Sequence, residues 1–412
     1  MTHFTFRTAH ESGAARHGWF DTPHGIVETP AFMPVGTNAT VRGLTMTEVE
    51  ATGARIVLGN AYHLFLRPGD AVVRALGGLH AFSRWSRPML TDSGGFQVYS
   101  LAKSRSVDER GVRFKSAIDG VVHDYTPERV MEIERNLGAD IIMQLDELVE
   151  SGSSPEASRD AMERSLRWLE RCRVAFDAIT REGRAPLGTI ATPIGTPDLS
   201  GHHSDDERIA PPQALFPIVQ GGLSPELRRV SISGILATGD WPGIAIGGLS
   251  VGEAKPDMYA TIEVCDAVMP RDRPRYLMGV GFPDDLVEGV RRGIDLCDCV
   301  VPTRMGQHGT AFTRDGSLQI KRSSHRLDGA PLVDGCTCVT CQHYDRAYLR
   351  HLFAAEEMLG LRLLSLHNVH FLVNLMAEAR EQLRAGRFPA WSEAFLVRYR
   401  AGGAKASTDG LR

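Results

Sequence analysis

From residue 32 onward, the chain alternates between short apolar runs and longer segments in which apolar residues recur with helical spacing. Each apolar run has the length of a strand that is buried on both faces, as the strands of a parallel sheet are. We therefore predict eight strands, in the following segments: Phe32–Val35, Arg55–Leu58, Pro88–Leu90, Asp140–Leu145, Leu215–Val219, Ile244–Ile246, Tyr276–Val280 and Leu296–Val301.

Amphipathic segments that predict helices separate most of these strands. Eight strands that alternate with helices over residues 32–302 indicate an α/β fold of the (β/α)₈ TIM-barrel type. An open doubly wound sheet is the alternative, but no G-x-G-x-x-G sequence follows the first strand. The predicted helices are Pro127–Leu137, Ala157–Ile179, Pro225–Ala237, Pro256–Val268 and Pro283–Arg292.

Polar residues or glycines follow most of the predicted strands. In a barrel of parallel strands, these positions all lie at the carboxyl-terminal end, where active sites are built. Glycine at such a position lets the backbone approach a planar ligand closely. We therefore expect a site formed by the following residues: Gly59-Asn60, Asp92-Ser93-Gly94-Gly95, Asp146-Glu147, Gln220-Gly221-Gly222, Gly247-Gly248, Gly281 and Asp298.

Three segments do not follow the barrel pattern. Residues 1–31 are polar and contain turn signals, which predicts an N-terminal antiparallel cap. Residues 183–213 are rich in Pro, Gly, Ser and Asp and lack apolar periodicity, so we expect a mobile surface loop there. Residues 402–412 have the composition of a frayed tail.

Composition narrows the class of protein. The 412 residues are 42% hydrophobic and 23% charged, as in ordinary globular proteins. No apolar run reaches the roughly 20 residues that a membrane helix needs, and the N-terminus is not a signal peptide, so we expect a cytoplasmic protein. The formal net charge of −4 argues against a broadly basic surface, and any nucleic acid must therefore bind a local patch.

Residues 293–312 combine an apolar strand with two aspartates. Asp295 and Asp298 interrupt the run Ile294–Val301, and a turn with two glycines follows. An unpaired carboxylate inside a buried strand is costly in free energy. Asp298, at the exit of this strand, is therefore either paired with a structural partner or exposed at the mouth of a working site.

The chain has seven cysteines, and three of them are closely spaced as Cys336-x-Cys338-x-x-Cys341. An odd number of cysteines without a secretory signal argues against a disulfide framework. Three neighbouring thiolates favour a zinc site, which needs four nitrogen or sulfur ligands. A closed set of four ligands makes one structural zinc rather than a catalytic one.

Four histidines are candidates for the fourth ligand. His343 is too near in sequence to complete a separate corner of the site, whereas His367 lies in a predicted helix, residues 361–381, that can fold back onto the loop. The candidates are His343, His351, His367 and His370.

The order of several motifs resembles that of tRNA-guanine transglycosylases, from about residue 4 to residue 400. The resemblance implies a zinc-bearing TIM barrel, followed by a subdomain over residues 303–401 that contacts tRNA and holds the zinc. The motifs are LGNAYHLFLRPG at 58–69, TDSGGFQV at 91–98, PIVQGG at 217–222, GGLSVGE at 247–253, YLMGVG at 276–281, DCVVPTRMGQHG at 298–309, and the C-x-C-x₂-C sequence with a later His-Asn at 367–368.

This family exchanges a genetically encoded guanine of tRNA for a 7-deazaguanine. Because the chain ends soon after the zinc region, it resembles the bacterial and eukaryotic enzymes that act at the anticodon wobble position on the way to queuosine. A homodimer is implied by the resemblance alone. The same resemblance makes His367 the fourth metal ligand, beside Cys336, Cys338 and Cys341.

The resemblance also implies roles for individual residues. Asp298 matches the nucleophile that attacks the anomeric ribose carbon, and Asp92 matches the general acid and base. The residues that match the base-binding set are Asp146 for the amino and ring N–H groups, Gln220 and the Gly248 amide for the carbonyl, Ser93 as an assisting group, Phe96 and Met278 on the two faces of the ring, and Leu249 beside the 7-substituent.

The RNA contacts follow from the resemblance and from local charge. Arg304 matches a residue that reads the anticodon loop. Lys321 and Arg322 belong to a basic strip before the zinc loop that suits phosphate contacts. The other members of the strip are Arg314, His325 and Arg326.

Two departures leave the incoming base open. Leu148 stands where the bacterial enzymes usually have cysteine, as in the queuine-using branch, and Gln307 stands where they usually have arginine. Val251, in contrast, matches the bacterial enzymes. The sequence therefore allows either the aminomethyl precursor or the larger, preformed queuine.

Three other functions compete with this interpretation. A non-catalytic tRNA-binding subunit would lack one of the two catalytic aspartates, and both are present. A related base-exchange enzyme acting on DNA needs the same chemistry, although Arg304 and the zinc loop favour tRNA. A zinc hydrolase on a TIM barrel would need His and carboxylate ligands at the strand ends, which offer no His-x-His.

Overall fold

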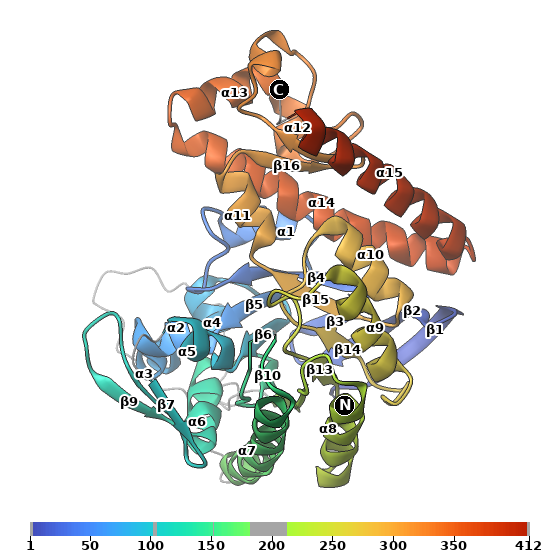
Figure 1. Cartoon of the computed structure of the whole chain (residues 1–412). Helices are drawn as coiled ribbons and strands as arrows, with labels where there is room; N and C mark the ends of the chain where they lie inside the picture. The colour runs from blue at the N-terminus through green and yellow to red at the C-terminus, as the bar shows by residue number, and fades with distance from the viewer. Residues whose placement is uncertain (1–2, 102–104, 151, 182–211, 410–412) are drawn as a thin grey trace.

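A computed structural model describes residues 3–101, 105–150, 152–181 and 212–409. A parallel sheet, nearly closed into a barrel, forms the centre of the molecule (Figure 1). All eight predicted strands are present, which confirms the predicted fold class. The order of the strands around the sheet is β11 (Ala214–Phe216), β10 (Ile141–Met143), β6 (Met89–Asp92), β5 (Val57–Asn60), β4 (Ala31–Gly36), β15 (Leu296–Cys299), β14 (Arg275–Leu277), β13 (Ile244–Ile246) and β12 (Ile218–Val219).

The fifth predicted strand is split in two at Pro217. Strand β11 pairs with β10 on one side, and strand β12 pairs with β13 on the other. Proline has no backbone N–H, so it interrupts the ladder of hydrogen bonds at this residue. The Gln144 side chain completes the seam, since its Oε1 accepts a hydrogen bond from the Ile218 N–H at 2.9 Å. The two halves together occupy the position of one barrel strand.

The five predicted helices lie outside the barrel. Proline occupies the first turn of all five, where its missing N–H costs nothing. Side chains cap three of the starts, because Thr126, Ser154 and Ser224 accept hydrogen bonds from the N–H groups of Arg129, Ala157 and Leu227. The helices are α6 (Pro127–Leu137), α7 (Pro155–Arg181), α8 (Pro225–Thr238), α9 (Lys255–Asp266) and α10 (Pro283–Arg291).

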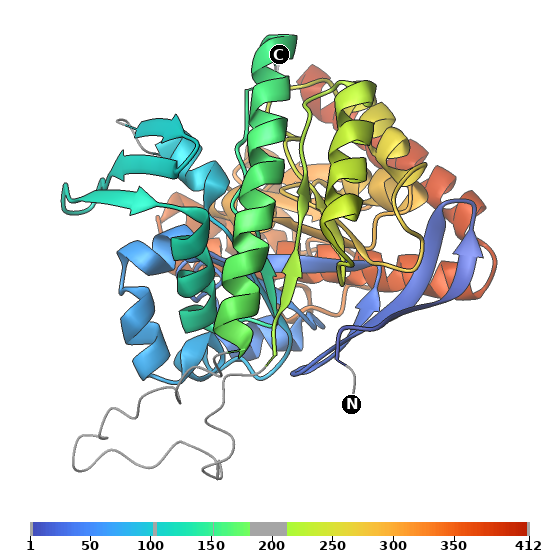
Figure 2. The same ribbon diagram turned by 90° about the horizontal axis from the view of Figure 1, so that it is seen from below.

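The N-terminal segment forms the predicted antiparallel cap, as a sheet of three strands (Figure 2). Phe20 is fully buried in one cluster with side chains of the barrel interior, and its ring lies 5.8 Å from that of Phe216. The cap therefore closes the amino-terminal end of the barrel and leaves the opposite end for a site. Its strands are β1 (Phe6–Ser12), β2 (Ala15–Thr22) and β3 (Gly25–Thr29).

Several short elements between the barrel strands were not predicted. A second antiparallel sheet, β7 to β9, leaves the barrel after β6, and small helices surround β5. These elements are too short for their hydrophobic pattern to be read in the sequence. They are α1 (Met46–Ala51), α2 (Ala61–Leu66), α3 (Asp70–Ala75), α4 (Gly78–Ser83), α5 (Gly95–Leu101), β7 (Arg105–Asp108), β8 (Gly111–Lys115) and β9 (Val122–Tyr125).

The C-terminal part is built around the long helix α14 (Met358–Arg384), which packs along the outer side of the barrel beside β4 (Figure 1). Asn368 on α14 accepts a hydrogen bond from the Phe312 N–H and donates to the carbonyls of Pro302 and Thr310. The elements are α11 (Val301–Gln307), β16 (Thr310–Thr313), β17 (Gly316–Gln319), the 3₁₀ helix η2 (Ser323–Leu327), α12 (Val339–His343), α13 (Arg346–Ala354), α14 (Met358–Arg384) and α15 (Phe388–Asp409).

We expected irregular structure in residues 402–412 and 183–213. The predicted tail is wrong for residues 402–409, which continue helix α15. The missing side chain of Gly402 allows α15 to contact the turn at Asp315, and Arg398 pairs with the same aspartate at 2.6 Å. Most of the predicted loop 183–213 lies outside the described residues, as do residues 410–412.

The boundary that we expected after residue 302 falls within α11, and the division into domains stays a prediction. Within the described part of the chain, no helix is long and apolar enough to cross a membrane.

Candidate active site

The carboxyl-terminal ends of the barrel strands surround a cavity of about 540 Å³. Asp92 ends strand β6, Asp298 lies in β15, and Asp146 follows β10. Nine of the residues predicted from the sequence line this cavity: Asp92, Ser93, Phe96, Asp146, Gly248, Leu249, Met278, Asp298 and Arg304. Segments that are more than 200 residues apart in the chain therefore meet at one point, as the barrel arrangement requires.

Asp298 is held by two neutral donors. The Tyr276 hydroxyl donates to its Oδ1 at 2.6 Å, and the Gly279 N–H donates to the same oxygen at 2.8 Å. Burial raises the pKa of this carboxyl, and the two hydrogen bonds oppose the rise because they stabilise the ionised form. Both bonds reach Oδ1, which leaves Oδ2 as the oxygen available for attack.

Asp92 is paired with Asn60 across two neighbouring strands. The two residues lie opposite each other in the register of β5 and β6, and the Asn60 amide donates to Asp92 Oδ2 at 2.6 Å. The Ala61 N–H donates to Oδ1 at 3.2 Å. Burial, and then the nearby charge of Asp298, raise the pKa of Asp92 to about 8. Asp92 is thus protonated near neutral pH and can donate a proton.

Asp146 contacts the side-chain amide of Gln220, another residue of the predicted base-binding set. Gln220 Nε2 donates to Asp146 Oδ2 at 2.6 Å. Burial raises the pKa of Asp146 to about 6, against the effect of this hydrogen bond. A β-carbon at Gly95 would lie 2.7 Å from Asp146 Oδ1, so this position must be glycine. The carboxylate is therefore fixed while its oxygens can still accept hydrogen bonds.

The remaining predicted base-binding residues surround these carboxylates. Ser93 is buried, and its carbonyl accepts a hydrogen bond from the Tyr125 hydroxyl at 2.8 Å. Phe96 lines the cavity with 49% of its surface exposed, and the partly buried Met278 lines it as well. Gly248 has a φ of +66°, which favours glycine. A planar ring can thus contact Phe96, Met278 and Leu249 through its apolar surface while its polar edge reaches Asp146.

No cation forms an ion pair with Asp92, Asp146 or Asp298 among the residues that the structure describes. One protonated carboxyl beside a second, hydrogen-bonded carboxyl can divide acid and nucleophile roles, as in glycosidases that retain configuration. The geometry therefore suits attack on an anomeric carbon.

The predicted RNA-contacting residues do not all reach this cavity. Arg304 lines it and is exposed on α11. Lys321 and Arg322 are exposed beyond β17 and do not line it. Lys321 lies over the ring of Phe353 at 5.5 Å. Only Arg304 is placed where it can contact a nucleotide whose base enters the cavity.

Cys336, Cys338, Cys341 and His367 come together in the C-terminal part. His367 Nδ1 lies 3.9, 3.4 and 3.4 Å from the three sulfurs in that order. His367 Nε2 lies 2.8 Å from the Phe312 carbonyl and donates to it, so Nδ1 directs its lone pair at the sulfurs. These four residues could hold a metal ion. The other three candidate histidines are not in the group.

The sequence matches the family described as queuine tRNA-ribosyltransferase over residues 11–401. The chain belongs to this family. Proteins named queuine tRNA-ribosyltransferase from Herpetosiphon aurantiacus and Symbiobacterium thermophilum are each 48% identical to it. The alignments cover 97% and 96% of this chain and 93% and 90% of the relatives. A protein of the same name from Acidithiobacillus ferrooxidans is 47% identical over 96% of this chain and 98% of its own length.

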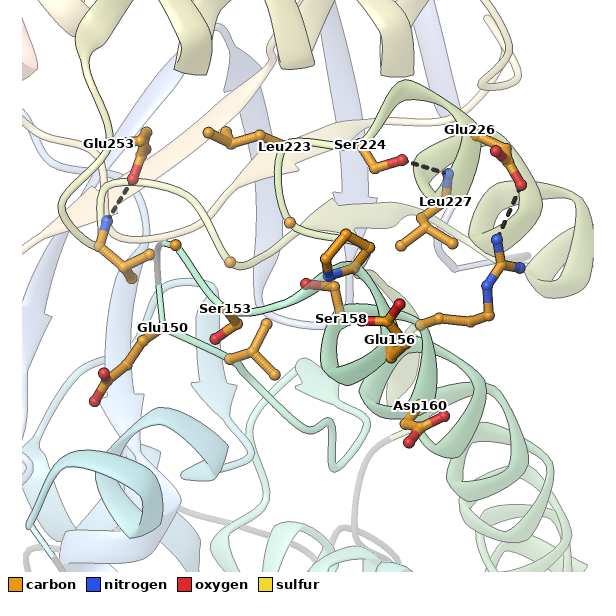
Figure 3. A pocket seen from close by; sticks show the side chains of 18 residues that line it. Glu150, Ser153, Glu156, Ser158, Asp160, Leu223, Ser224, Glu226, Leu227 and Glu253 are labelled. Carbon is orange, nitrogen blue, oxygen red and sulfur yellow. Dashed lines mark hydrogen bonds and ion pairs between the residues drawn. The ribbon is translucent and has the colours of Figure 1, made fainter.

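This member of the queuine tRNA-ribosyltransferase family has a second cavity of about 610 Å³, and Figure 3 shows the side chains that line it. Gly248 and Val251 line both cavities. The Glu253 carboxylate accepts hydrogen bonds from the N–H groups of Ser250 and Val251, which fixes the segment between the two cavities. Several exposed acidic side chains, among them Glu150 and Glu156, surround the second cavity.

Sequence reasoning missed two polar residues that support the site, Tyr276 and Arg228. It included Asn60 among the expected site residues but did not indicate that Asn60 pairs with Asp92. Tyr276 stood only within an apolar run. Arg228, on helix α8, is fully buried and donates to the carbonyls of Val219 and Gly247. A charged residue within an amphipathic helix gives no signal of burial, because most arginines on such helices are exposed.

Proposed function

We propose that the chain is a tRNA-guanine transglycosylase that exchanges the wobble guanine of tRNAs with GUN anticodons for a 7-deazaguanine. Family membership supports the reaction class. The observation that carries the proposal is the meeting of Asp92, Asp146 and Asp298 in one cavity without a cationic partner among the described residues. This arrangement offers a nucleophile, an acid and an acceptor for the edge of a guanine.

The proposed reaction has two steps, in which guanine leaves and the new base enters on one face of the ribose while Asp298 attacks from the opposite face. Asp298 Oδ2 bonds to the anomeric carbon while the bond to guanine breaks, and Asp92 donates its proton to the leaving base. The incoming 7-deazaguanine then loses its N9 proton to Asp92, and its nitrogen displaces Asp298. The pKa of about 8 at Asp92 supports this order, because the acid starts protonated.

Base recognition uses the polar edge of the ring. Asp146 accepts hydrogen bonds from the amino and ring N–H groups, and Gln220 with the Gly248 N–H donates to the carbonyl. Phe96 and Met278 hold the ring faces by stacking and dispersion contacts. Two further predicted contacts complete the set, since Ser93 assists and Leu249 lies beside the 7-substituent.

The identity of the incoming base depends on the wall of the cavity. Leu148 and Val251 both line it, as a position near the 7-substituent requires. They point to different branches of the family, so both the aminomethyl precursor and queuine are candidates for the incoming base. The substitution Leu148→Cys or Val251→Gly should shift the preference of the chain between the two incoming bases.

The tRNA and a zinc ion complete the proposal. Arg304 contacts the anticodon loop, and Lys321 and Arg322 contact phosphates farther along the strand. The Cys₃His set fits zinc, which prefers thiolate and imidazole ligands, and when bound it would stabilise the C-terminal part without taking part in the chemistry. We keep the homodimer and the cytoplasmic location as expectations from the family resemblance and the sequence.

The zinc assignment can be tested by metal content. Cys338→Ser should remove the metal and lower the melting temperature of the C-terminal part. Cys172→Ser, at a buried cysteine away from the cluster, is the control and should keep one zinc per chain. Unchanged metal content in Cys338→Ser would refute the ligand set.

The function is tested by loading a GUN-anticodon tRNA with radiolabelled guanine and chasing with each base separately. Release by the aminomethyl precursor alone would indicate synthesis of queuosine, and release by queuine would indicate salvage. A chain that loads no guanine into tRNA would contradict the proposal, and loading of DNA instead would favour the DNA-modifying alternative.

A further inference from the structure

Helix α8 places a buried guanidinium beneath the candidate base-binding loops. Arg228 is 0% exposed. Its Nε donates to the Gly222 carbonyl at 2.9 Å, and its Nη1 donates to the carbonyls of Val219 and Gly247 at 2.7 and 2.8 Å. Among the described residues, no carboxylate lies within ion-pair distance of it. The three carbonyls therefore have to offset much of the cost of burying this charge.

The second amino group of Arg228 has no hydrogen-bond partner in the described part of the chain, although it is buried. This atom, Nη2, lies against Gly248. A β-carbon at Gly248 would be 3.6 Å from Nη2 and 2.5 Å from Gln220 Oε1. Because glycine has no β-carbon, the guanidinium and the amide oxygen border the same small space. The unpaired Nη2 and the Gln220 oxygen thus both lie close to the position that a β-carbon of Gly248 would take.

Gln220 lies between two groups of opposite hydrogen-bonding character. On one side, the Asp146 carboxylate can only accept, and Gln220 Nε2 donates to it at 2.6 Å. On the other side, the guanidinium can only donate. Both neighbours therefore favour the same orientation of the amide, with its NH₂ group at Asp146 and its carbonyl oxygen towards Arg228.

We propose that Arg228 is a positioning residue that fixes the orientation of the Gln220 amide and thereby makes the site specific for a base with an oxo group at the guanine carbonyl position. This inference rests on the proposed function. With the amide oxygen directed at Arg228, the NH₂ group has one N–H for Asp146 and one for the base. The Gly248 N–H adds a second donor. A base that presents a weak acceptor leaves these buried donors unpaired.

A purely structural role for Arg228 makes a different prediction. If it only joined the loops through the three carbonyls, its loss would disturb every base to the same extent. If it orients Gln220, its loss affects mainly the discrimination between bases that differ at the carbonyl. The pair guanine and 6-thioguanine separates the two cases, because the analogue keeps the other donors and replaces the oxygen with sulfur, a weak acceptor.

The first test compares Arg228→Lys with Arg229→Lys, the same substitution at the exposed neighbouring residue. Lysine keeps the charge but loses the forked second amino group. In Arg228→Lys we expect a higher KM for guanine, an unchanged KM for tRNA, and a preference for guanine over 6-thioguanine that falls about tenfold, as for the loss of one hydrogen bond. Arg229→Lys should match the unaltered chain. An equal loss of kcat/KM for both bases in Arg228→Lys would overturn the proposal.

The second test needs no variant, and it decides the case if Arg228→Lys does not fold. In crystals of the unaltered chain with guanine bound, Arg228 Nη2 should lie within about 3.2 Å of Gln220 Oε1. A separation beyond about 4 Å, with guanine present, would overturn this inference and leave the proposed function standing. A chain that neither binds nor exchanges guanine would overturn both.

Discussion

The two ends of the barrel surround buried carboxylates with different partners. At the carboxyl-terminal end, the described residues offer Asp92 and Asp298 only neutral hydrogen-bond donors, such as the Asn60 amide and the Tyr276 hydroxyl. Asp146 likewise contacts an amide. The pKa values of all three carboxyls are raised by burial.

At the amino-terminal end, the buried carboxylates have basic partners. Asp295 is paired with Arg16, whose Nε and Nη2 donate to it at 3.1 and 2.5 Å. Asp140 has two imidazoles, with His24 Nδ1 at 2.7 Å and His80 Nε2 at 3.2 Å. Hydrogen bonds from these imidazoles help to lower the pKa of Asp140 to about 2, against the effect of burial.

Asp295 and Asp298 show the difference within a single stretch of three residues. One lies just before strand β15 and the other inside it, so they belong to opposite ends of the same strand. The sequence leaves open whether Asp298 has a structural partner or lies at a working mouth. In the structure, Asp295 is the residue with a structural partner, Arg16, whereas Asp298 lines the cavity. A buried carboxylate without a cation costs stability, and this cost is acceptable where reactivity requires it.

Asp298→Asn should have the largest effect on activity. We expect a loss of base exchange of at least about 10³-fold, because the amide cannot bond to the ribose. The free energy of unfolding should not fall, since no cation is left without its partner. Exchange of radiolabelled guanine measures the activity, and denaturant titration measures the free energy of unfolding. Normal turnover in this variant would refute the assignment of the nucleophile.

Asp295→Asn should have the largest effect on stability. The substitution leaves Arg16 buried without its carboxylate, and we expect the free energy of unfolding to fall by about 3–5 kcal/mol. Denaturant titration measures this change. Asp21→Asn is the control, because it breaks the exposed pair with Arg7 and should cost less than about 1 kcal/mol. Equal losses in the two variants would remove the distinction between buried and exposed pairs.

The raised pKa of Asp92 predicts how exchange depends on pH. The carboxyl is protonated below its pKa of about 8 and loses the proton above it. Release of guanine should therefore slow by about tenfold for each pH unit above 8, if this proton is the one donated. Rates of guanine release between pH 6 and 10 measure the effect. A rate that keeps rising to pH 10 would exclude Asp92 as the acid.

Asp140 should make the free energy of unfolding depend on pH in the opposite direction, with a loss at low pH. This effect should be smaller than those above. Its pKa in the folded chain is about 2, below the ordinary value near 3.9 in an unfolded chain. Its contribution of about 2.5 kcal/mol is thus fully present above about pH 5 and is lost as the pH falls through 2. The difference in unfolding free energy between the unaltered chain and Asp140→Asn should shrink over this range. A constant difference would show that the carboxylate charge does not matter.

Much of the fold could be predicted because each barrel strand is a short apolar run that is visible in the sequence. The candidate site could be predicted because barrel geometry gathers the residues that follow such runs. Residues that act through register or through distant contacts could not be predicted. The pairing of Asn60 with Asp92 depends on the alignment of two strands. The sheet β7 to β9 lacks a long hydrophobic pattern, and its strands have several exposed residues.

A cluster that combines distant segments of the chain could also not be predicted from the sequence. Asp140 meets His24 from the turn between β2 and β3 and His80 from α4, and neither histidine lies near a recognisable motif. The zinc-type cluster was easier to predict, since three of its four candidate ligands are closely spaced in the sequence. The family resemblance already implied His367 as the fourth ligand, and the folded chain brings this residue, rather than His343, His351 or His370, to the three cysteines.

The most direct test of this account is to find where the ribose becomes attached during turnover. The unaltered chain would be mixed with a GUN-anticodon tRNA, quenched with acid and digested, and the modified peptide identified by mass spectrometry. We predict a ribose adduct on Asp298, absent in Asp298→Asn and present in Asp295→Asn. An adduct on another residue, or active exchange without any adduct, would contradict the view that the carboxylate without a cation is the reactive one.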